Sequence, residues 1–261
     1  MDKTVISAAR AVEDVPSGAS LAVGGFGLCG IPADLIGALV EGPATGLRVV
    51  SNNCGVDDAG LGRLLAAGRI ARMTSSYVGE NKEFARRYLE GELEVELTAQ
   101  GTLAERLRAG GSGIPAFYTP AGAGTLLAEG GLPWRYHPDG TVALASPPRE
   151  VREFGGRAYL LEEAIVCDFA LVRAAVGDRH GNLAFHAAAR NFNPLCAMAG
   201  RVTVAEVERL VAPGALDPGR IDLPGIFVQR VVTVRDAGDK HIERRTVRPR
   251  PAQEARDGMD T

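Results

Sequence analysis

Three glycines near the start of the chain are spaced as G-x-G-x-x-G, in the segment Gly25-Phe26-Gly27-Leu28-Cys29-Gly30. A short apolar run precedes them, and apolar residues at helical spacing follow Pro32. Glycines allow backbone N–H groups to approach a ligand closely, and the start of a helix adds positive potential. Such a loop can bind a dinucleotide, a phosphate, a pantetheine chain or a carbonyl oxygen, or it can be a tight turn that binds nothing.

The residues after the second apolar run argue against a dinucleotide. A dinucleotide site needs an acidic residue near the end of its second strand to bind the ribose hydroxyls. The second apolar run, at residues 47–50, leads instead into Ser51-Asn52-Asn53. In addition, Pro32 stands at the start of the expected helix, just after the third glycine. An asparagine can hydrogen-bond a hydroxyl, but it is not the expected acid. The sequence therefore disfavours NAD without identifying the ligand.

Thiols and imidazoles show no metal-binding pattern. The cysteines are far apart, form no C-x-x-C pair and lie in apolar or loop segments, which predicts buried reduced thiols: Cys29, Cys54, Cys167 and Cys196. The histidines are scattered, and the nearest two are six residues apart rather than four: His137, His180, His186 and His241. We predict no metal site.

Two further polar pairs invite a functional interpretation. Glu162 and Glu163 are adjacent in a strand-like segment, so their side chains point to opposite faces and cannot act together. One of them is expected to be buried and structural. Arg190-Asn191 offers groups that suit a carboxylate substrate, but a structural loop is the favoured interpretation.

Strand–loop–helix units that recur about every 25 residues must position these groups. Strands are expected over residues 20–23, 47–50, 70–78 and 93–98, and helices over 8–12, 33–40, 61–68, 81–91 and 101–111 with a stop at Gly110. Residues 111–156 are rich in Gly and Pro, and strand-like pieces follow at 159–166, 168–178, 182–188 and 202–211. This pattern predicts one α/β domain over residues 1–234, with a largely parallel sheet covered by helices. Residues 235–261 form a polar extension, expected to be partly disordered.

Composition excludes several classes of partner. The chain has 261 residues, 46% of them hydrophobic, and a net charge of -3, so it carries no basic footprint for nucleic acid or an anionic membrane. No run approaches the roughly 20 apolar residues of a spanning helix, and the first residues do not form a secretory signal. We expect a cytoplasmic protein.

The segment VGGFGLCGIP closely resembles the glycine-rich signature of the α-type subunit of family I coenzyme A transferases. Further blocks resemble the succinyl-CoA:3-oxoacid branch, among them SNNCGVDDAGLG, SSYVGENKEF, LTAQGT, PREVREFGG and RNFNP. The resemblance runs from Thr4 to about Val232. Ser17 departs from the Asp or Asn usual at its position, but serine also serves in a turn.

The resemblance implies a fold of the coenzyme A transferase type and ping-pong chemistry on a glutamate, which takes up CoA as a thioester. In the family this glutamate lies in a Ser-Glu-Asn-Gly motif of the β-type half. This chain has only Gly79-Glu80-Asn81-Lys82, inside an α-type block, and we interpret Glu80 as an acid in the first turn of a helix. The chain should therefore be half of an enzyme, active only with a β-type subunit, in an assembly of two copies of each.

The resemblance also implies which residues form the site. Side-chain amides that position the substrate and stabilise its oxyanion are expected from Asn52, Asn53 and Gln100. From the residues alone, a loop or cap pair and a polar strand end explain these three equally well or better. The wall of the CoA or acyl pocket is expected from Gly24, Gly25, Phe26, Gly27, Leu28, Cys29, Gly30 and Ile31. Cys29 should pack there without thiol chemistry.

The predicted reaction moves CoA from succinyl-CoA to a 3-oxo acid such as acetoacetate, with acyl-CoA as substrate and no tightly bound cofactor. A coenzyme A transferase for 3-oxoadipate or a short-chain fatty acid is the nearest alternative. An NAD-dependent oxidoreductase and a ligand-binding regulator of similar architecture are more distant ones.

Overall fold

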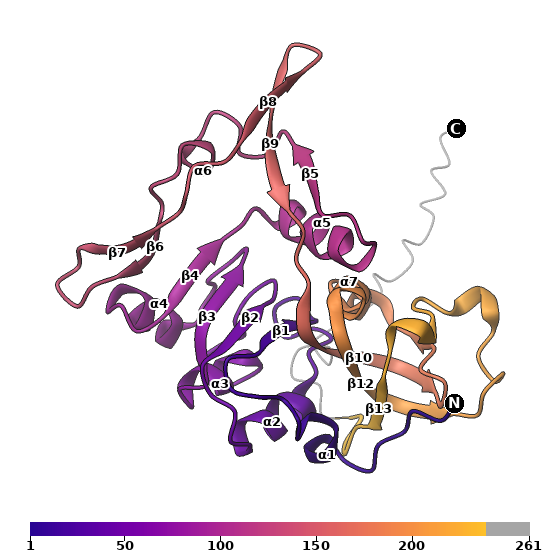
Figure 1. Ribbon diagram of the computed structural model, residues 1–261. Helices are drawn as coiled ribbons and strands as arrows, with labels where there is room; N and C mark the ends of the chain where they lie inside the picture. The colour runs from indigo at the N-terminus through magenta and orange to yellow at the C-terminus, as the bar shows by residue number, and fades with distance from the viewer. Residues whose placement is uncertain (239–261) are drawn as a thin grey trace, which may run out of the picture.

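The computed structural model describes residues 1–238 (Figure 1). The disorder predicted for the last residues, and His241, lie outside the described residues. The centre of the protein is an eight-stranded sheet. Seven strands follow the order β13-β12-β10-β1-β2-β3-β4, and the short β11 pairs with β10. The strands of this sheet are β1 (Ser20–Val23), β2 (Leu47–Val50), β3 (Ile70–Ser75), β4 (Glu94–Leu97), β10 (Cys167–Asp178), β11 (Leu183–Ala184), β12 (Gly200–Val211) and β13 (Arg230–Thr233). All the pairings are parallel except that of β10 with β11, as the recurring strand–loop–helix units predicted.

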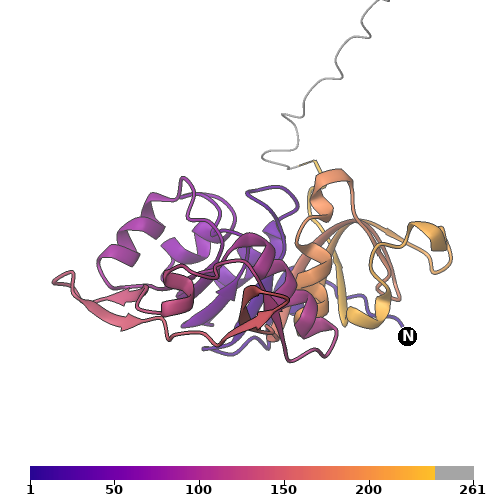
Figure 2. The same ribbon diagram turned by 90° about the horizontal axis from the view of Figure 1, so that it is seen from above.

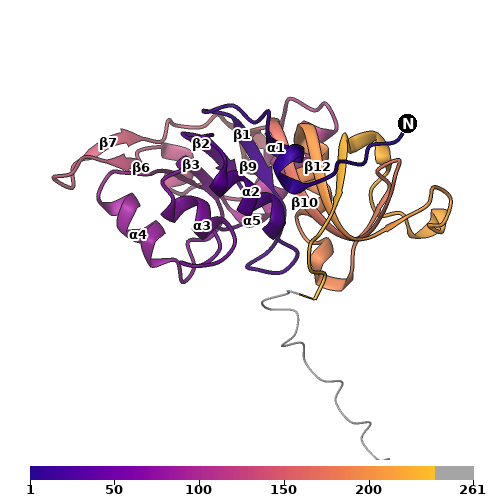
Figure 3. The same cartoon turned by 90° about the horizontal axis from the view of Figure 1, so that it is seen from below.

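Helices cover both faces of the sheet. One face packs on α1 (Ala8–Val12), α2 (Ala33–Glu41), α3 (Leu61–Ala66) and α4 (Lys82–Leu89). The other packs on α5 (Gln100–Gly111) and α7 (Asn193–Ala199), as Figures 1 and 3 show. The alternation within β1 divides its side chains between the two cores: Leu21 and Val23 belong to the first, and Ala22 to the second. The fold class predicted from the sequence is confirmed.

The glycine-rich stretch between α5 and β10 forms two small antiparallel sheets that project from the body (Figures 1 and 2). They consist of β5 (Ala116–Thr119), β6 (Pro133–Tyr136), β7 (Val142–Ala145), β8 (Val151–Phe154) and β9 (Arg157–Glu163), with the short helix α6 (Leu126–Glu129) between β5 and β6. Segment 159–166, expected to be a strand, therefore contributes β9 to a projecting sheet and not to the central one.

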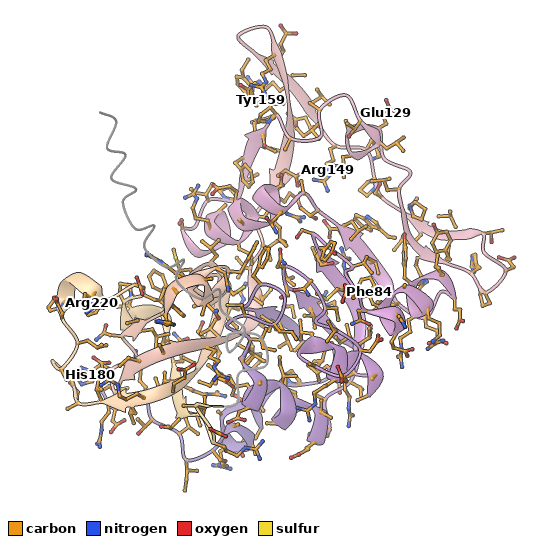
Figure 4. The ribbon with its side chains drawn as sticks, turned by 180° about the vertical axis from the view of Figure 1, so that it is seen from behind. Phe84, Glu129, Arg149, Tyr159, His180 and Arg220 are labelled. Carbon is orange, nitrogen blue, oxygen red and sulfur yellow. The ribbon has the colours of Figure 1, made fainter. Side chains whose placement is uncertain are left out.

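Buried ion pairs attach this projecting part to the body. Glu96 of β4 is 5% exposed and accepts hydrogen bonds from Arg106 at 2.6 Å and from Arg72 at 2.7 Å. Arg149 lies 3.9 Å from Glu96 and also pairs with Glu162, at the base of the projecting part in Figure 4. Glu162 is 4% exposed while Glu163 is exposed, so the expectation of one buried structural glutamate is confirmed.

One helix was not predicted, and one local prediction was wrong. Helix α7 was not predicted, because its short apolar sequence NPLCAMA has no distinctive period. Glu80 is not in the first turn of α4: Asn81 caps that helix, accepting from the Phe84 N–H at 2.8 Å, and Glu83 is the first-turn acid.

The turn and helix-end signals fared better. Helix α5 ends within a residue of the predicted stop at Gly110. Ser17 works as a local acceptor, since its hydroxyl takes a hydrogen bond from the Thr45 N–H at 3.1 Å. Within residues 1–238, no helix is long and apolar enough to cross a membrane.

Candidate active site at the carboxyl edge of the sheet

The candidate site lies where the strand order reverses. From β1 the chain proceeds through β2 and β3 to β4 on one side, while β10, β12 and β13 lie on the other. In sheets of this kind, ligands bind at the carboxyl ends of the strands beside such a reversal. The glycine loop, residues 24–31, leaves β1 at this point, and the Gly24 N–H still bonds to the Leu171 carbonyl of β10 at 2.9 Å.

The glycine loop is closed by two mutual backbone hydrogen bonds. The N–H groups of Phe26 and Cys29 each donate to the other residue's carbonyl at 3.0 Å, which leaves Gly27 and Leu28 at the tip. Gly25, Gly27 and Gly30 have φ angles of 116°, 60° and 70°, a region that residues with a Cβ rarely adopt. Among residues 1–238, the backbone N–H groups of Gly27 and Leu28 have no hydrogen-bond acceptor. The tip therefore offers two unused donors to a ligand.

A second loop, residues 51–60, follows β2 and packs against the first. A Cβ at Gly60 would stand 3.2 Å from the side chains of both Ile31 and Leu28, so the absence of a side chain lets the loops approach. The Asn81 side chain donates from Nδ2 to the Cys54 carbonyl at 2.9 Å and so braces this second loop from the start of α4.

Asn52 is held by donors from two neighbouring strand ends. Its Oδ1 accepts from Gln100 Nε2 at 2.7 Å and from Ser76 Oγ at 2.9 Å. Ser76 follows β3, and Gln100 is the first residue of α5, just after β4. Because both donors hold Oδ1, the orientation of the amide is fixed. Asn52 Nδ2 has no acceptor among the described residues and is left for a ligand.

Asn53 is also buried, at 7% exposed, and its side-chain amide has no hydrogen-bond partner within residues 1–238. Gln100, in contrast, is exposed. The structure thus brings two of the three predicted side chains, Asn52 and Gln100, into direct contact. Asn53 is the chain neighbour of Asn52. Their roles toward a substrate stay predictions.

A buried glutamate side chain already occupies the start of α2. Glu206 of β12 is fully buried, and its Oε2 accepts from the Leu35 N–H in the first turn of the helix at 3.0 Å. Burial raises the pKa of Glu206 to about 8, although the Leu35 N–H and the Arg173 guanidinium act in the opposite direction. Since Glu206 takes a donor that a phosphate would need, the dinucleotide and phosphate interpretations of the glycine loop lose support.

The cysteine thiols and the possible metal ligands are the next candidates. Cys54, Cys167 and Cys196 are buried free thiols, as predicted, whereas Cys29 is partly exposed. Burial raises the pKa of the Cys54 and Cys167 thiols to about 12. Among residues 1–238, no group of three or more His, Cys, Asp or Glu side chains could hold a metal ion.

Arg190 pairs with Asp222 at 3.2 Å, while the Asn191 side chain bonds to backbone carbonyls. The favoured interpretation of this pair as a structural loop thus agrees with its contacts.

Sequence reasoning assigned no site role to Ser76, Asn81 or Asn193. Ser76 directly follows strand β3, and Asn81 directly precedes helix α4. These positions at element ends were the signal available in the sequence. Taken together, the edge presents neutral donors: the Asn52 and Asn53 amides and the backbone of the glycine loop. Such groups can stabilise a negatively charged oxygen without forming an ion pair with a nearby carboxylate nucleophile.

Comparisons with known proteins identify the family of the chain. The family described as coenzyme A transferase matches residues 5–233. The chain is 65% identical over 248 residues, 95% of its length, to the whole of one subunit of a probable succinyl-CoA:3-ketoacid coenzyme A transferase of Mycobacterium bovis. It is 53% identical over 250 residues to a mitochondrial succinyl-CoA:3-ketoacid coenzyme A transferase 2A of Mus musculus, covering 95% of this chain and 48% of that one.

A solved structure shows the same fold. An acyl-CoA transferase from E. coli O157:H7, crystallised as a thioester complex with CoA, superposes with a TM-score of 0.77 at 24% identity, over 92% of this chain and 49% of that one. The family match extends from before β1 to the end of β13, and therefore includes both loops and every strand of the central sheet. The chain belongs to the coenzyme A transferase family.

Proposed function

We propose that this chain is the α-type subunit of a succinyl-CoA:3-oxoacid coenzyme A transferase and that a separate β-type chain supplies the nucleophilic glutamate. The observation that supports this best is the amide pair Asn52 and Gln100 beside the glycine loop. Among residues 1–238, no carboxylate is hydrogen-bonded to Asn52, Asn53 or Gln100. The relative from Mycobacterium bovis is named as one subunit of such an enzyme, which supports a division of the active site between two chains.

In the proposed reaction, the partner's glutamate attacks the thioester carbonyl of succinyl-CoA. The C–S bond breaks, CoA leaves as a thiolate, and a mixed anhydride of succinate and the glutamate remains. The thiolate then attacks the glutamyl carbonyl and releases succinate, which leaves a glutamyl-CoA thioester. The 3-oxo acid repeats these two steps in reverse order and leaves as its CoA thioester.

Each addition places negative charge on a carbonyl oxygen, and this chain's contribution is to stabilise that charge. The Asn52 Nδ2 group and the Gly27 and Leu28 N–H groups are available donors at the carboxyl edge. A preorganised donor of this kind contributes about 2.7–4 kcal/mol to the transition state. Ser76 and Gln100 hold Asn52 in place, and the rest of residues 24–31 form the wall of the acyl or CoA pocket.

Acetoacetate is the proposed acceptor, and an assembly of two α-type and two β-type chains is the proposed active form. A transferase for 3-oxoadipate or a short-chain fatty acid would use the same residues. The named relatives favour the 3-oxo acid. The free thiols at Cys54, Cys167 and Cys196 are typical of a reducing compartment, which supports the predicted cytoplasmic location.

The test is to purify the chain alone and after co-expression with candidate β-type chains, and to assay CoA transfer from succinyl-CoA to a panel of acids. We expect activity only in the complex, and highest with acetoacetate. Transfer by the isolated chain would contradict the division of the site. A complex that forms but transfers CoA to no acid, while the chain binds NADH in a thermal-shift assay, would contradict the transferase itself.

A further inference from the structure

We propose that Asn191 and Asn193, which no motif or relative assigns to the chemistry, are positioning residues that fix the glycine loop before substrate binds. This inference rests on the proposed function of the loop. Both asparagines lie about 160 residues further along the chain: Asn191 directly follows a 3-10 turn (Ala187–Arg190), and Asn193 is the first residue of α7. Each donates a side-chain hydrogen bond to a backbone carbonyl of the loop.

Asn193 is fully buried, and every polar atom of its side chain has a partner. Its Nδ2 donates to the Gly30 carbonyl at 2.9 Å and to the Ala189 carbonyl at 2.8 Å. Its Oδ1 accepts from the Arg173 N–H of β10 at 3.0 Å. One amide thus links the end of the glycine loop, the 3-10 turn and the strand next to β1.

Asn191 repeats the arrangement one residue earlier in the loop. Its Nδ2 donates to the Cys29 carbonyl at 3.1 Å and to the Ala188 carbonyl at 2.8 Å, while its Oδ1 accepts from the Phe192 N–H at 2.7 Å. Ala187, with a φ of 46°, holds an unusual conformation at the start of this segment. Such strain of about 1–3 kcal/mol persists only where the surrounding structure enforces it.

The loop therefore has a packed side and an open side. A Cβ on Gly24 would stand 2.0 Å from Asn193 Oδ1, and one on Gly30 would stand 2.9 Å from the Ala189 carbonyl oxygen. A Cβ on Gly27 would meet nothing within 4 Å. Gly24 and Gly30 are thus needed for close approach to residues 187–193, which we call the asparagine segment. The tip of the loop between these glycines stays free to contact a ligand.

Two held carbonyls fix the peptide planes on the packed side and so limit how the tip can move. Oxyanion stabilisation depends on donors that are already in place when charge develops. A displacement of about 1 Å can cost a factor of about 10² in rate. The two asparagines would thus act on the transition state through the loop, without touching the substrate.

The experiment compares Asn191→Ala and Asn191→Asp in the co-purified complex. Asn191→Asp keeps the oxygen that accepts from Phe192 and replaces Nδ2 by a carboxylate oxygen, which cannot donate to Cys29 and Ala188 and instead repels their carbonyl oxygens. Asn182→Ala is the matched control: Asn182 is also half-buried and has two side-chain hydrogen bonds, to Asp178 and from Gly225. Asp178 lies seven residues along β10 from Leu171, roughly 23 Å at about 3.3 Å per residue.

We expect both Asn191 variants to assemble, to lower kcat about 10- to 100-fold with KM changed less than about threefold, and to speed hydrogen–deuterium exchange of residues 24–31. Asn182→Ala should lower the melting temperature of the complex about as much as the Asn191 variants do. It should leave kcat and the exchange of residues 24–31 unchanged. Wild-type exchange in both Asn191 variants would overturn the inference, as would an equal loss of kcat in Asn182→Ala. If the wild-type complex transfers no CoA, the proposed function fails, and the exchange of residues 24–31 alone still decides the inference.

Discussion

Gln100 Nε2 donates to Asn52 Oδ1 at 2.7 Å, so a residue at the start of α5 is bonded directly to one that follows β2. The strand β3 lies between β2 and β4 in the sheet, and Ser76 at its end donates to the same oxygen. Three strand ends are therefore joined through one carbonyl oxygen, and the N–H₂ group of Asn52 is directed by the other two side chains.

Gln100→Ala and Asn52→Ala should each lower kcat, Asn52→Ala by about 10²-fold or more because it removes a proposed donor. Gln100→Ala should lower kcat by a smaller factor, because Ser76 still donates to Asn52 Oδ1 and keeps its amide oriented. The double variant should lose less than the product of the two factors, since the Gln100 side chain acts through Asn52. Steady-state kinetics of the complex measures this. The control is Gln229→Ala, an exposed glutamine that accepts one backbone hydrogen bond at the opposite edge of the sheet. Multiplicative losses would show that the two residues act independently.

Gly24→Ala should prevent the native loop from forming, because the new Cβ would stand 2.0 Å from Asn193 Oδ1. Gly101→Ala is the comparison: its Cβ would meet nothing within 4 Å, and alanine is favoured over glycine in a helix by about 1 kcal/mol. Thermal unfolding should show a much lower melting temperature for Gly24→Ala and an unchanged or higher one for Gly101→Ala. Equal melting temperatures would mean that the loop can move aside at no cost.

Glu96→Gln should destabilise the chain by about 3–5 kcal/mol, because Arg72 and Arg106 would lose a buried counter-charge. Burial raises the pKa of Glu96, but the two guanidiniums more than offset this, so that it lies below the ordinary value of 4.5. The ionised Glu96 therefore stabilises the fold above pH 4.5, and this contribution is lost as the pH falls through the lower, folded-state pKa. Urea unfolding at neutral and acidic pH measures both effects. The exposed pair of Arg108 and Glu105 supplies the control Glu105→Gln, expected to change stability by at most about 0.5 kcal/mol.

Glu206→Gln should show the opposite pH dependence. The pKa of Glu206 is raised from 4.5 to about 8, so between these values the folded state binds a proton that the unfolded state releases. Stability from this group is present below pH 4.5 and is lost as the pH rises to about 8. Arg173 and Asp34 are the charged groups that face it, and glutamine can still accept from Leu35. The free energy of unfolding of the variant, relative to wild type, should rise from pH 5 to pH 8. A constant difference over that range would contradict a protonated Glu206.

The central part of the fold was predictable because its period is regular. Apolar runs such as Ser20–Val23 and the helical spacing after Pro32 directly reflect burial on a covered parallel sheet. The helix α7 was not predictable, since it is stabilised by packing against β10 and α5 rather than by its own pattern. Strand β9 pairs with β5 and β8 rather than with the central sheet, and the apolar pattern of segment 159–166 does not distinguish these partners.

The candidate site was only partly predictable for the same reason. Asn52, Asn53 and the glycine loop follow strands, and residues at the carboxyl ends of parallel strands meet at one edge. That Gln100 bonds to Asn52 depends on the register of three strands. That Asn191 and Asn193 hold the loop depends on a contact across about 160 residues, for which the spacing of residues along the chain gives no signal.

The place of β1 in the middle of the sheet also has a kinetic consequence. Ser20, at the start of β1, bonds to Asp168 of β10, 148 residues later. At about 5–20 residues per second, a ribosome needs roughly 7–30 s to make the intervening chain. During this time β1 can pair only with β2, and the glycine loop lacks both the neighbouring strand and the asparagine segment that hold it. A nascent chain shorter than about 200 residues should therefore expose the loop to proteases, and the loop should become protected in a single late step of synthesis.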